Sequence, residues 1–152
     1  MKKTFLHFID GSFTESTSKR WIDVFNPATG DVYGQVSAGT IEDVDLAVKS
    51  SKRAFTSWSK TKREERADFL FLLSNEIKKN NDEFAELESI DTGKPLSLAR
   101  TVDIPRAAKN LDFFAKLILE YKNETFLSQE SITRVIQKPR GVAGIISPWN
   151  LP

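Results

Sequence analysis

Three places in this sequence carry residues that could take part in chemistry. Asn150 ends a Pro-Trp-Asn turn after a short apolar run, and its side-chain amide is a neutral hydrogen-bond donor. Arg106 follows Pro105, and a guanidinium pairs with a carboxylate through two parallel hydrogen bonds. Asp91 precedes a Gly-Lys-Pro break, and a carboxylate suits a hard cation. Taken singly, each residue also has a structural interpretation: a turn cap, a solvated surface arginine and a helix-terminal hydrogen bond.

Composition excludes several other functions. The 152 residues include no Cys, so the chain holds no disulfide, no thiolate metal site and no cysteine nucleophile. Its 22 basic and 21 acidic side chains give a net charge of +1, which provides no broad field for nucleic acid or an anionic membrane. The N-terminus does not resemble a signal peptide, and no apolar run approaches the roughly 20 residues of a membrane span. We therefore expect a cytoplasmic protein with no nucleic-acid or membrane partner.

The first forty residues favour strands and turns. Asp10-Gly11 predicts a two-residue hairpin turn, in which both central residues need positive φ. Strands are expected at residues 21–25 and 32–36, with a turn over Asn26-Pro-Ala-Thr-Gly30 between them.

From Thr40 the apolar residues recur at helical spacing. We predict helix starts at Thr40 with Asp43, at Thr61 with Glu64 and at Asn80 with Glu83, each an N-cap signature. Gly93-Lys-Pro95 should end the third helix, and a short helical stretch should follow through Ala99. Asp103-Ile-Pro105 should then cap the last helix. The expected apolar side of the second helix comprises Phe69, Leu70, Leu73 and Ile77.

After Tyr121 the helical pattern ends. Residues 123–141 are polar and then rich in β-forming residues, which predicts a protruding hairpin arm; such arms are common oligomer contacts, although an ordinary surface hairpin fits equally well. Residues 142–146 predict a short strand buried on both faces. Gly141-x-x-Gly144 is not a dinucleotide-binding fingerprint.

Five motifs together resemble the NAD(P)-dependent aldehyde dehydrogenases, in order and spacing, over essentially the whole chain. They are Phe8-Ile-Asp-Gly11, Phe25-Asn-Pro-Ala-Thr-Gly30, Asp43-Val-Asp-Leu-Ala-Val48, Asp91-Thr-Gly-Lys-Pro95 and Ser147-Pro-Trp-Asn150. The stretch from Ala99 to Arg106 is most similar to the 2-aminomuconic and 2-hydroxymuconic semialdehyde dehydrogenase branch, with betaine aldehyde dehydrogenases next.

The resemblance implies a role for each candidate residue. Asn150 would donate to the oxyanion formed when a thiolate attacks the aldehyde, and Arg106 would hold the substrate carboxylate, with Arg100 a weaker alternative. Asp91, with backbone carbonyls near Val24 and Phe25, would bind a monovalent cation. The residues implied to line the nicotinamide cofactor are Ile146, Ser147, Pro148 and Trp149. NAD is the expected cofactor, and NADP stays an alternative.

The implied fold class is α/β, specifically the N-terminal portion of the aldehyde dehydrogenase fold. Residues 1–122 would belong to the cofactor-binding domain, 123–141 to the hairpin arm of the oligomerisation domain, and 142–152 to the first strand and turn of the dinucleotide-binding sheet. We expect a homo-oligomer formed through the arm, acting on a small aldehyde. Without the family's cysteine, these residues alone should be inactive. The alternatives are a short non-catalytic subunit bound to a full-length dehydrogenase and a free-standing helical binding domain.

Overall fold

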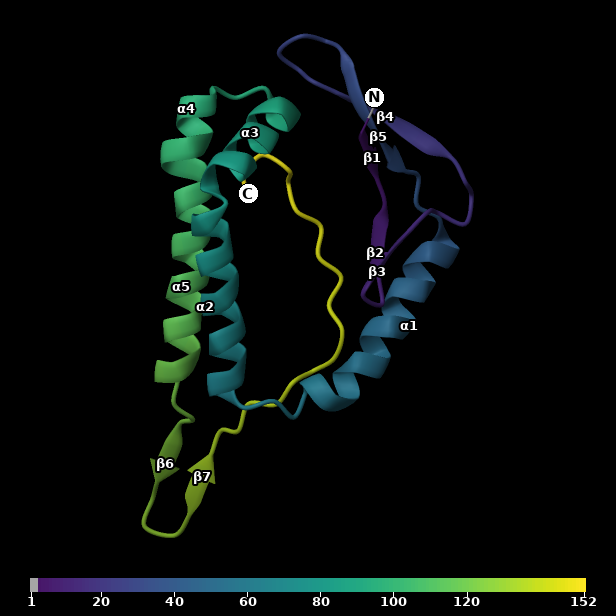
Figure 1. The fold of residues 1–152 in the computed structure, drawn as a ribbon. Coiled ribbons are helices and arrows are strands. Elements are labelled where there is room, and N and C mark those ends of the chain that lie inside the picture. The colour runs from purple at the N-terminus through teal and green to yellow at the C-terminus, as the bar shows by residue number, and fades with distance from the viewer. Residues whose placement is uncertain (1–2) are drawn as a thin grey trace.

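The computed structural model describes residues 3–152. Its strands are β1 (Lys3–Phe5), β2 (His7–Ile9), β3 (Ser12–Thr14), β4 (Trp21–Phe25), β5 (Val32–Ser37), β6 (Thr125–Leu127) and β7 (Ile132–Arg134). Its helices are α1 (Ile41–Trp58), α2 (Arg63–Lys79), α3 (Asn81–Thr92), α4 (Leu96–Leu98), the π-helix η1 (Ala99–Asp103) and α5 (Ile104–Glu120). The first five strands and α1 lie on one side of the molecule and the remaining helices on the other (Figure 1).

The strands form a three-stranded sheet in the order β1-β5-β4 and two separate hairpins. Strand β1 runs parallel to β5, whereas β4 pairs with β5 antiparallel. The expected strands at 21–25 and 32–36 are thus confirmed, with β5 one residue longer. Asp10 and Gly11 have φ of 56° and 77°, which confirms the tight turn between β2 and β3.

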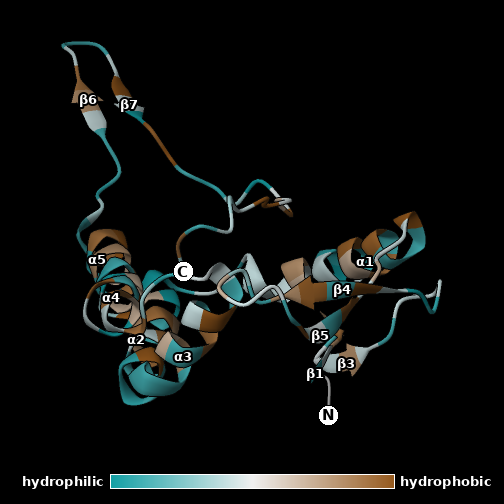
Figure 2. Cartoon of the chain, turned by 90° about the horizontal axis from the view of Figure 1, so that it is seen from above, coloured by the Kyte–Doolittle hydropathy of each residue, from teal (hydrophilic) through white to brown (hydrophobic). Residues whose placement is uncertain are grey.

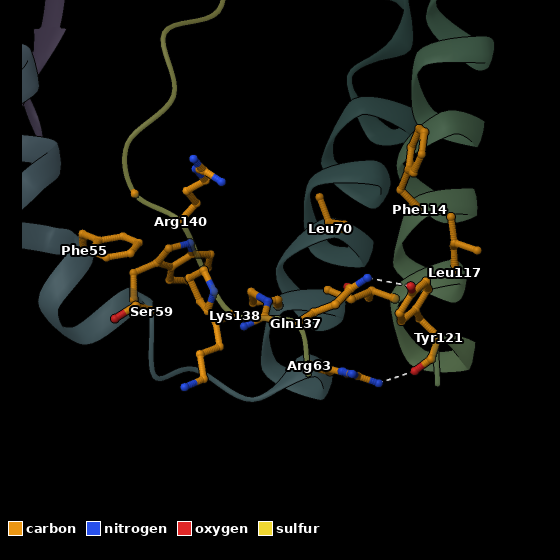
Figure 3. A pocket seen from close by; sticks show the side chains of 15 residues that line it. Phe55, Ser59, Arg63, Leu70, Phe114, Leu117, Tyr121, Gln137, Lys138 and Arg140 are labelled. Carbon is orange, nitrogen blue, oxygen red and sulfur yellow. Dashed lines mark hydrogen bonds between the residues drawn. The ribbon is translucent and has the colours of Figure 1, made fainter. Parts of the chain in front are cut away.

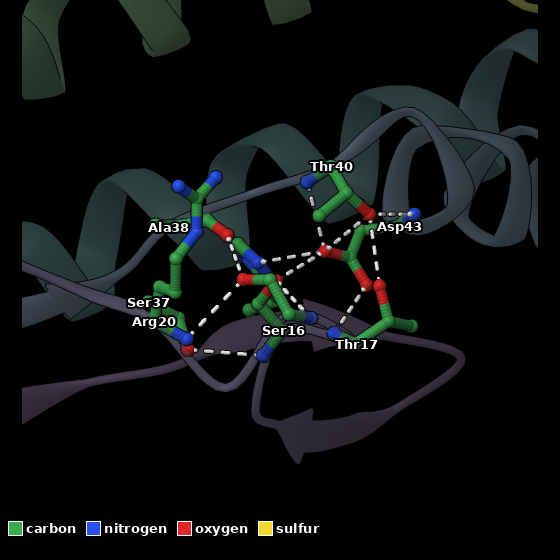
Figure 4. Close-up of polar contacts among 9 residues, drawn as sticks. Ser16, Thr17, Arg20, Ser37, Ala38, Thr40 and Asp43 are labelled. Carbon is green, nitrogen blue, oxygen red and sulfur yellow. Dashed lines mark hydrogen bonds and ion pairs between the residues drawn. The ribbon is translucent and has the colours of Figure 1, made fainter.

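The N-terminus of α1 is bonded to the strand region through the buried carboxylate of Asp43 (Figure 4). Asp43 accepts hydrogen bonds from the Thr40 backbone N–H at 2.9 Å and the Thr17 N–H at 3.0 Å. The Ser16 hydroxyl donates to it at 2.6 Å, and His7 Nε2 lies 3.8 Å away. The capping box predicted from Thr40 and Asp43 is confirmed, and the same carboxylate also orders the loop between β3 and β4.

We expect Asp43→Asn to change the acid stability of the protein. The Ser16 hydrogen bond, with the N–H groups of Thr17 and Thr40, holds the pKa of Asp43 well below its ordinary value. Because the folded pKa is the lower one, this carboxylate stabilises the fold above about pH 4 and loses its contribution as the pH falls further. Urea midpoints measured as a function of pH should therefore decline less steeply on the acid side in Asp43→Asn. Asp45→Asn, at an exposed position on the same helix, is the control; an Asp43→Asn profile parallel to that of the parent would contradict the prediction.

Helices α2 and α5 lie side by side (Figure 1), and small residues form their contact. Ala67 and Ser74 of α2 and Ala108 and Ala115 of α5 are buried, which lets the two backbones approach closely. The Ser74 hydroxyl donates to the Ala108 carbonyl at 2.9 Å. The expected apolar side of α2 was therefore partly wrong: Leu70 and Ile77 are partly buried, but Phe69 and Leu73 are half exposed.

Two of the predicted N-caps were also wrong in detail. Lys62, one residue after the predicted Thr61, is the N-cap of α2, and its ammonium has no acceptor with which to cap the helix. The Thr61 hydroxyl donates to the Trp58 carbonyl at 2.7 Å. Asn80 does precede α3, but its amide donates to the Glu76 carbonyl at 2.8 Å instead of capping. Both helices begin where expected, within two residues, without the expected bonds.

The end of α3 and the start of α5 enclose a small apolar core. Gly93 ends α3 with φ of 73°, which confirms the predicted stop. The next helix in the chain, α4, is followed without a break by the π-helix η1 and then by α5. Ala85, Ala99 and Ile104 are buried there, and Ile77 and Leu96 pack against them. Asp103 does not cap α5: its backbone is helical, and its buried side chain takes part in the ion pairs described below.

The predicted hairpin arm is present as β6 and β7, which project away from the helices (Figure 1). Residues 135–152, the return segment, then run back from the arm toward the helices without regular secondary structure (Figure 1). Gln137 anchors the start of this return by donating to the Tyr121 hydroxyl at 2.6 Å, beside a cavity of about 630 Å³ whose walls come from α1, α2, α5 and residues 137–141 (Figure 3). The strand expected at 142–146 is not formed, since no described strand lies alongside to satisfy its backbone hydrogen bonds.

Helices α1 and α5 carry hydrophobic residues, brown on the ribbon in Figure 2, and several of them are exposed. Val44 and Phe114, for example, are 60% and 56% exposed. Within residues 3–152, no helix combines the length and the apolar character needed to cross a bilayer.

Candidate active site around Lys94, Arg106 and Asn150

The return segment brings its terminal turn to the junction of α3 and α5, where a group of ion pairs lies. The Lys94 ammonium donates to Glu88 Oε1 at 2.7 Å, to Asp103 Oδ2 at 2.9 Å and to the Asn150 backbone carbonyl at 3.2 Å. The Lys94 and Glu88 side chains are 14% and 15% exposed, and that of Asp103 is 5% exposed. Hydrogen bonds to Glu88 and then Asp103 raise the pKa of Lys94 above its ordinary value. Lys94 is therefore a permanent cation at neutral pH.

Arg106 belongs to the same group. One guanidinium nitrogen donates to Asp103 Oδ1 at 2.7 Å, while the side chain is 46% exposed. Asp103 thus accepts from Lys94 with one oxygen and from Arg106 with the other. It is the last residue of the π-helix that precedes α5. Single π-turns within helices are frequent at functional sites. The remaining N–H groups of Arg106 point to no acceptor within residues 3–152. Arg100, the weaker candidate, instead pairs with the exposed Asp82 of α3 at 2.9 Å.

The terminal turn presents its side chains to the surface. Ile146 is fully exposed and Trp149 is 82% exposed, and Ser147 and Pro148 are also exposed. Trp149 has φ of +55°, a left-handed conformation that costs a residue with a Cβ roughly 1–2 kcal/mol. The side-chain amide of Asn150 makes no hydrogen bond within the described part of the chain, so it does not cap this turn. Residues 146–150 are therefore exposed to a ligand, and the Asn150 amide is available to donate to it.

Asp91 makes no hydrogen bond to these ion pairs, but it lines a cavity of about 520 Å³ that Val24, Glu88 and Pro152 also line. The Tyr33 hydroxyl donates to Asp91 Oδ1 at 2.6 Å. Burial and this bond together raise the pKa of Tyr33 to about 12. The structural hydrogen bond considered for Asp91 is thus present. In residues 3–152, no three His, Asp or Glu side chains gather as they would around a multivalent metal ion.

The structure therefore brings Asn150 and Arg106 onto one set of ion pairs and leaves Asp91 outside it. Sequence reasoning missed the residue that connects them, Lys94, and its partner Glu88. The available signal was the lysine that directly follows the helix-ending Gly93, a position whose side chain can turn back over the end of α3. Asp103 was recognised, but as a helix cap.

Residues 13–152 match the model of the aldehyde dehydrogenase family. The chain belongs to this family. Among curated relatives, it is 40% identical to the human 2-aminomuconic semialdehyde dehydrogenase over 96% of the chain, and 40% identical to the 2-hydroxymuconic semialdehyde dehydrogenase of Pseudomonas sp. strain CF600 over 99%. It spans 30% and 32% of the length of these two proteins.

Solved structures agree with the fold. The HpcC protein of Thermus thermophilus superposes with a TM-score of 0.92 at 36% identity, over 99% of this chain and 29% of that one. An NAD+ complex of the Bacillus cereus aldehyde dehydrogenase gives a TM-score of 0.80 at 31% identity, over 86% of this chain and 27% of that one. The predicted α/β class, as the N-terminal portion of the aldehyde dehydrogenase fold, is confirmed, and the family uses a nicotinamide cofactor.

Proposed function

We propose that this chain supplies the oxyanion donor and the carboxylate-binding arginine of a dehydrogenase that oxidises a muconic-type semialdehyde to a carboxylate. The observation that carries the proposal is the group of ion pairs that joins Arg106, through Asp103 and Lys94, to the backbone of Asn150. Both semialdehyde dehydrogenases named above match nearly the whole chain, which supports the substrate class.

The chemistry needs few groups from this chain. When a thiolate adds to the aldehyde carbon, a C–S bond forms and the carbonyl electron pair moves onto oxygen. The Asn150 amide, free of other partners among residues 3–152, would donate to that oxyanion as a neutral group whose protonation does not change. Arg106 would hold the distant carboxylate of the substrate through its unused N–H groups, which orients the aldehyde carbon. The thiolate itself must come from outside these 152 residues, because they contain no Cys.

A nicotinamide cofactor would accept the hydride in the next step, and residues 146–149 fit one wall of its site. Their side chains are exposed, so the apolar ones, Ile146 and Trp149 among them, are free to meet a flat ring. Residues that contact the ribose would decide between NAD and NADP. We propose NAD because this chain is similar to the dehydrogenase solved as an NAD+ complex.

The hairpin arm is the proposed oligomer contact. Phe126, Leu127 and Ile132 on β6 and β7 are 56%, 75% and 64% exposed, and both strands have an unpaired edge within the described part of the chain. A partner strand along either edge would bury them. The same arm would serve the alternative function, a short non-catalytic subunit that binds a full-length dehydrogenase.

We also propose that Asp91 contributes to a monovalent-cation site with carbonyl oxygens near Val24, since both residues line one cavity. Its second carboxylate oxygen is not engaged by Tyr33. In that case, K⁺ in place of choline should raise the thermal midpoint of the parent chain and leave that of Asp91→Asn unchanged. Equal responses of the two proteins would show that Asp91 makes only its structural bond.

The proposed function can be tested in a chimera. Residues 1–152 replace the matching segment of the Pseudomonas 2-hydroxymuconic semialdehyde dehydrogenase, which this chain matches over 99% of its length. We expect the chimera to reduce NAD⁺ with 2-hydroxymuconic semialdehyde at a kcat/KM at least about tenfold above that for hexanal, a difference of about 1.4 kcal/mol. The 152-residue chain alone should reduce no NAD⁺. Turnover by the chain alone, or a chimera without this preference, would contradict the proposal.

A further inference from the structure

We infer that Lys94 is a positioning residue that fixes the oxyanion donor Asn150 and the carboxylate-binding Arg106 relative to each other. The inference rests on the proposed roles of those two residues and adds a third, which neither the family match nor the relatives assign. Because all three donors of Lys94 meet protein oxygens, we assign it no contact with substrate or cofactor. It acts through its two contacts, the Asn150 carbonyl and the Asp103 carboxylate.

The geometry of Lys94 uses its full hydrogen-bonding capacity. An ammonium has three donors, and here each one meets an oxygen from a different element: Glu88 on α3, Asp103 in η1 and Asn150 in the terminal turn. The terminal turn has no regular secondary structure of its own, so this contact joins it to the helices. Movement of the Lys94 nitrogen would therefore displace the backbone that carries the Asn150 amide.

The charges explain how Arg106 stays available for a substrate. Two cations, Lys94 and Arg106, face two carboxylates, Glu88 and Asp103, so the group is neutral overall. Because Lys94 occupies Oδ2 of Asp103, Arg106 is left with a single-oxygen contact to Oδ1. Without Lys94, Arg106 would be the only cation beside this buried carboxylate among the described residues and could bind both oxygens bidentately. Its guanidinium would then be withdrawn from an incoming carboxylate.

This arrangement fixes the distance between the two groups that would bind the substrate. The substrate would place its aldehyde at Asn150 and its carboxylate at Arg106. Lys94 bonds to Asn150 directly and to Arg106 through Asp103. The chemical class selected is therefore an aldehyde that also carries a carboxylate at a fixed distance from the aldehyde carbon. An aldehyde without a carboxylate uses only the Asn150 end.

The test uses the chimera and the variant Glu88→Gln/Lys94→Met. This double substitution removes one charge of each sign, so Asp103 keeps Arg106 as its partner and no buried charge is left alone. Lys78→Met/Asp112→Asn is the matched control, because that pair of 2.5 Å joins α2 to α5 and makes no contact with Lys94, Asp103 or Arg106. Lys94→Arg is a second variant that keeps the charge, while its planar guanidinium cannot reproduce three tetrahedrally arranged donors.

We expect the double variant to raise KM for 2-hydroxymuconic semialdehyde about tenfold, with KM for hexanal within about twofold, because only the former uses Arg106; the loss of a hydrogen bond to a charged group is of this order. Because Asn150 serves both substrates, kcat should fall about tenfold for each. Lys94→Arg should retain the parental thermal midpoint and still lower kcat. Parental kinetics in a folded Glu88→Gln/Lys94→Met or Lys94→Arg chimera would overturn the inference. The double variant could lower kcat for hexanal while Arg106→Gln leaves KM for 2-hydroxymuconic semialdehyde unchanged. That result would reject the proposed substrate and retain the link from Lys94 to Asn150.

Discussion

Replacing Asn150 with alanine in the chimera is expected to lower kcat by roughly 10²–10³-fold and to change KM little. Its amide has no other partner within the described residues, so truncation should break no hydrogen bond in the ground state. The developing oxyanion loses a donor that is aimed at it only in the transition state. An interaction of that kind lowers kcat and kcat/KM together when it is removed.

Asn150→Ala is not expected to disturb the fold. The residue contacts the helices through its backbone carbonyl, which alanine retains, so the bond to Lys94 should survive. Asn110→Ala, at an exposed position on α5, is the matched control and should leave kcat within about twofold. Steady-state rates with saturating NAD⁺ and both aldehydes provide the measurement. If Asn150→Ala retained kcat within about threefold of the parent, the residue would be a turn residue and not the oxyanion donor.

Local signals in the sequence predicted most of the elements correctly. Asp10-Gly11, Thr40 with Asp43 and Gly93 each act through hydrogen bonds or backbone angles that involve neighbours a few residues away, and all three lie where expected. The caps assigned to Thr61 and Asn80 were wrong: Lys62 takes the N-cap position of α2, and Asn80 has φ of −105° and ψ of 25° in place of the extended backbone of a capping residue. The two side chains instead donate to carbonyls of the preceding helix. A short polar side chain can bond backwards or forwards, and the sequence does not distinguish the two.

Non-local features were predicted less well. An apolar run such as 142–146 becomes a strand only when other strands pair with it, and the described residues provide none. Phe69 and Leu73 follow the helical period, yet α5 packs against the small residues beside them. Lys94 is a single lysine in sequence. Its role depends on Asp103 and Asn150, which are 9 and 56 residues further along the chain.

Arg106→Gln in the chimera should raise KM for 2-hydroxymuconic semialdehyde by roughly 10–100-fold, the range expected when a charged hydrogen bond to a carboxylate is lost. KM for hexanal should stay within about twofold, since an uncharged aldehyde has no group for the guanidinium. The fold should tolerate the change, because Gln keeps the side chain's stem and Asp103 retains Lys94. Arg106→Lys should recover only part of the loss, because an ammonium offers a point charge and not a bidentate fork.

The difference between the two substrates separates this role from a structural one. If Arg106 only supported Asp103, its loss would disturb the Lys94 contacts and raise KM or lower kcat for both aldehydes alike. Arg100→Gln gives the matched control: its side chain is 42% exposed and pairs with Asp82, so both KM values should stay near those of the parent. A selective effect at Arg106 and none at Arg100 would assign the substrate carboxylate to the first turn of α5. Equal effects of Arg106→Gln on both substrates would remove muconic-type semialdehydes as the substrate class that this residue selects.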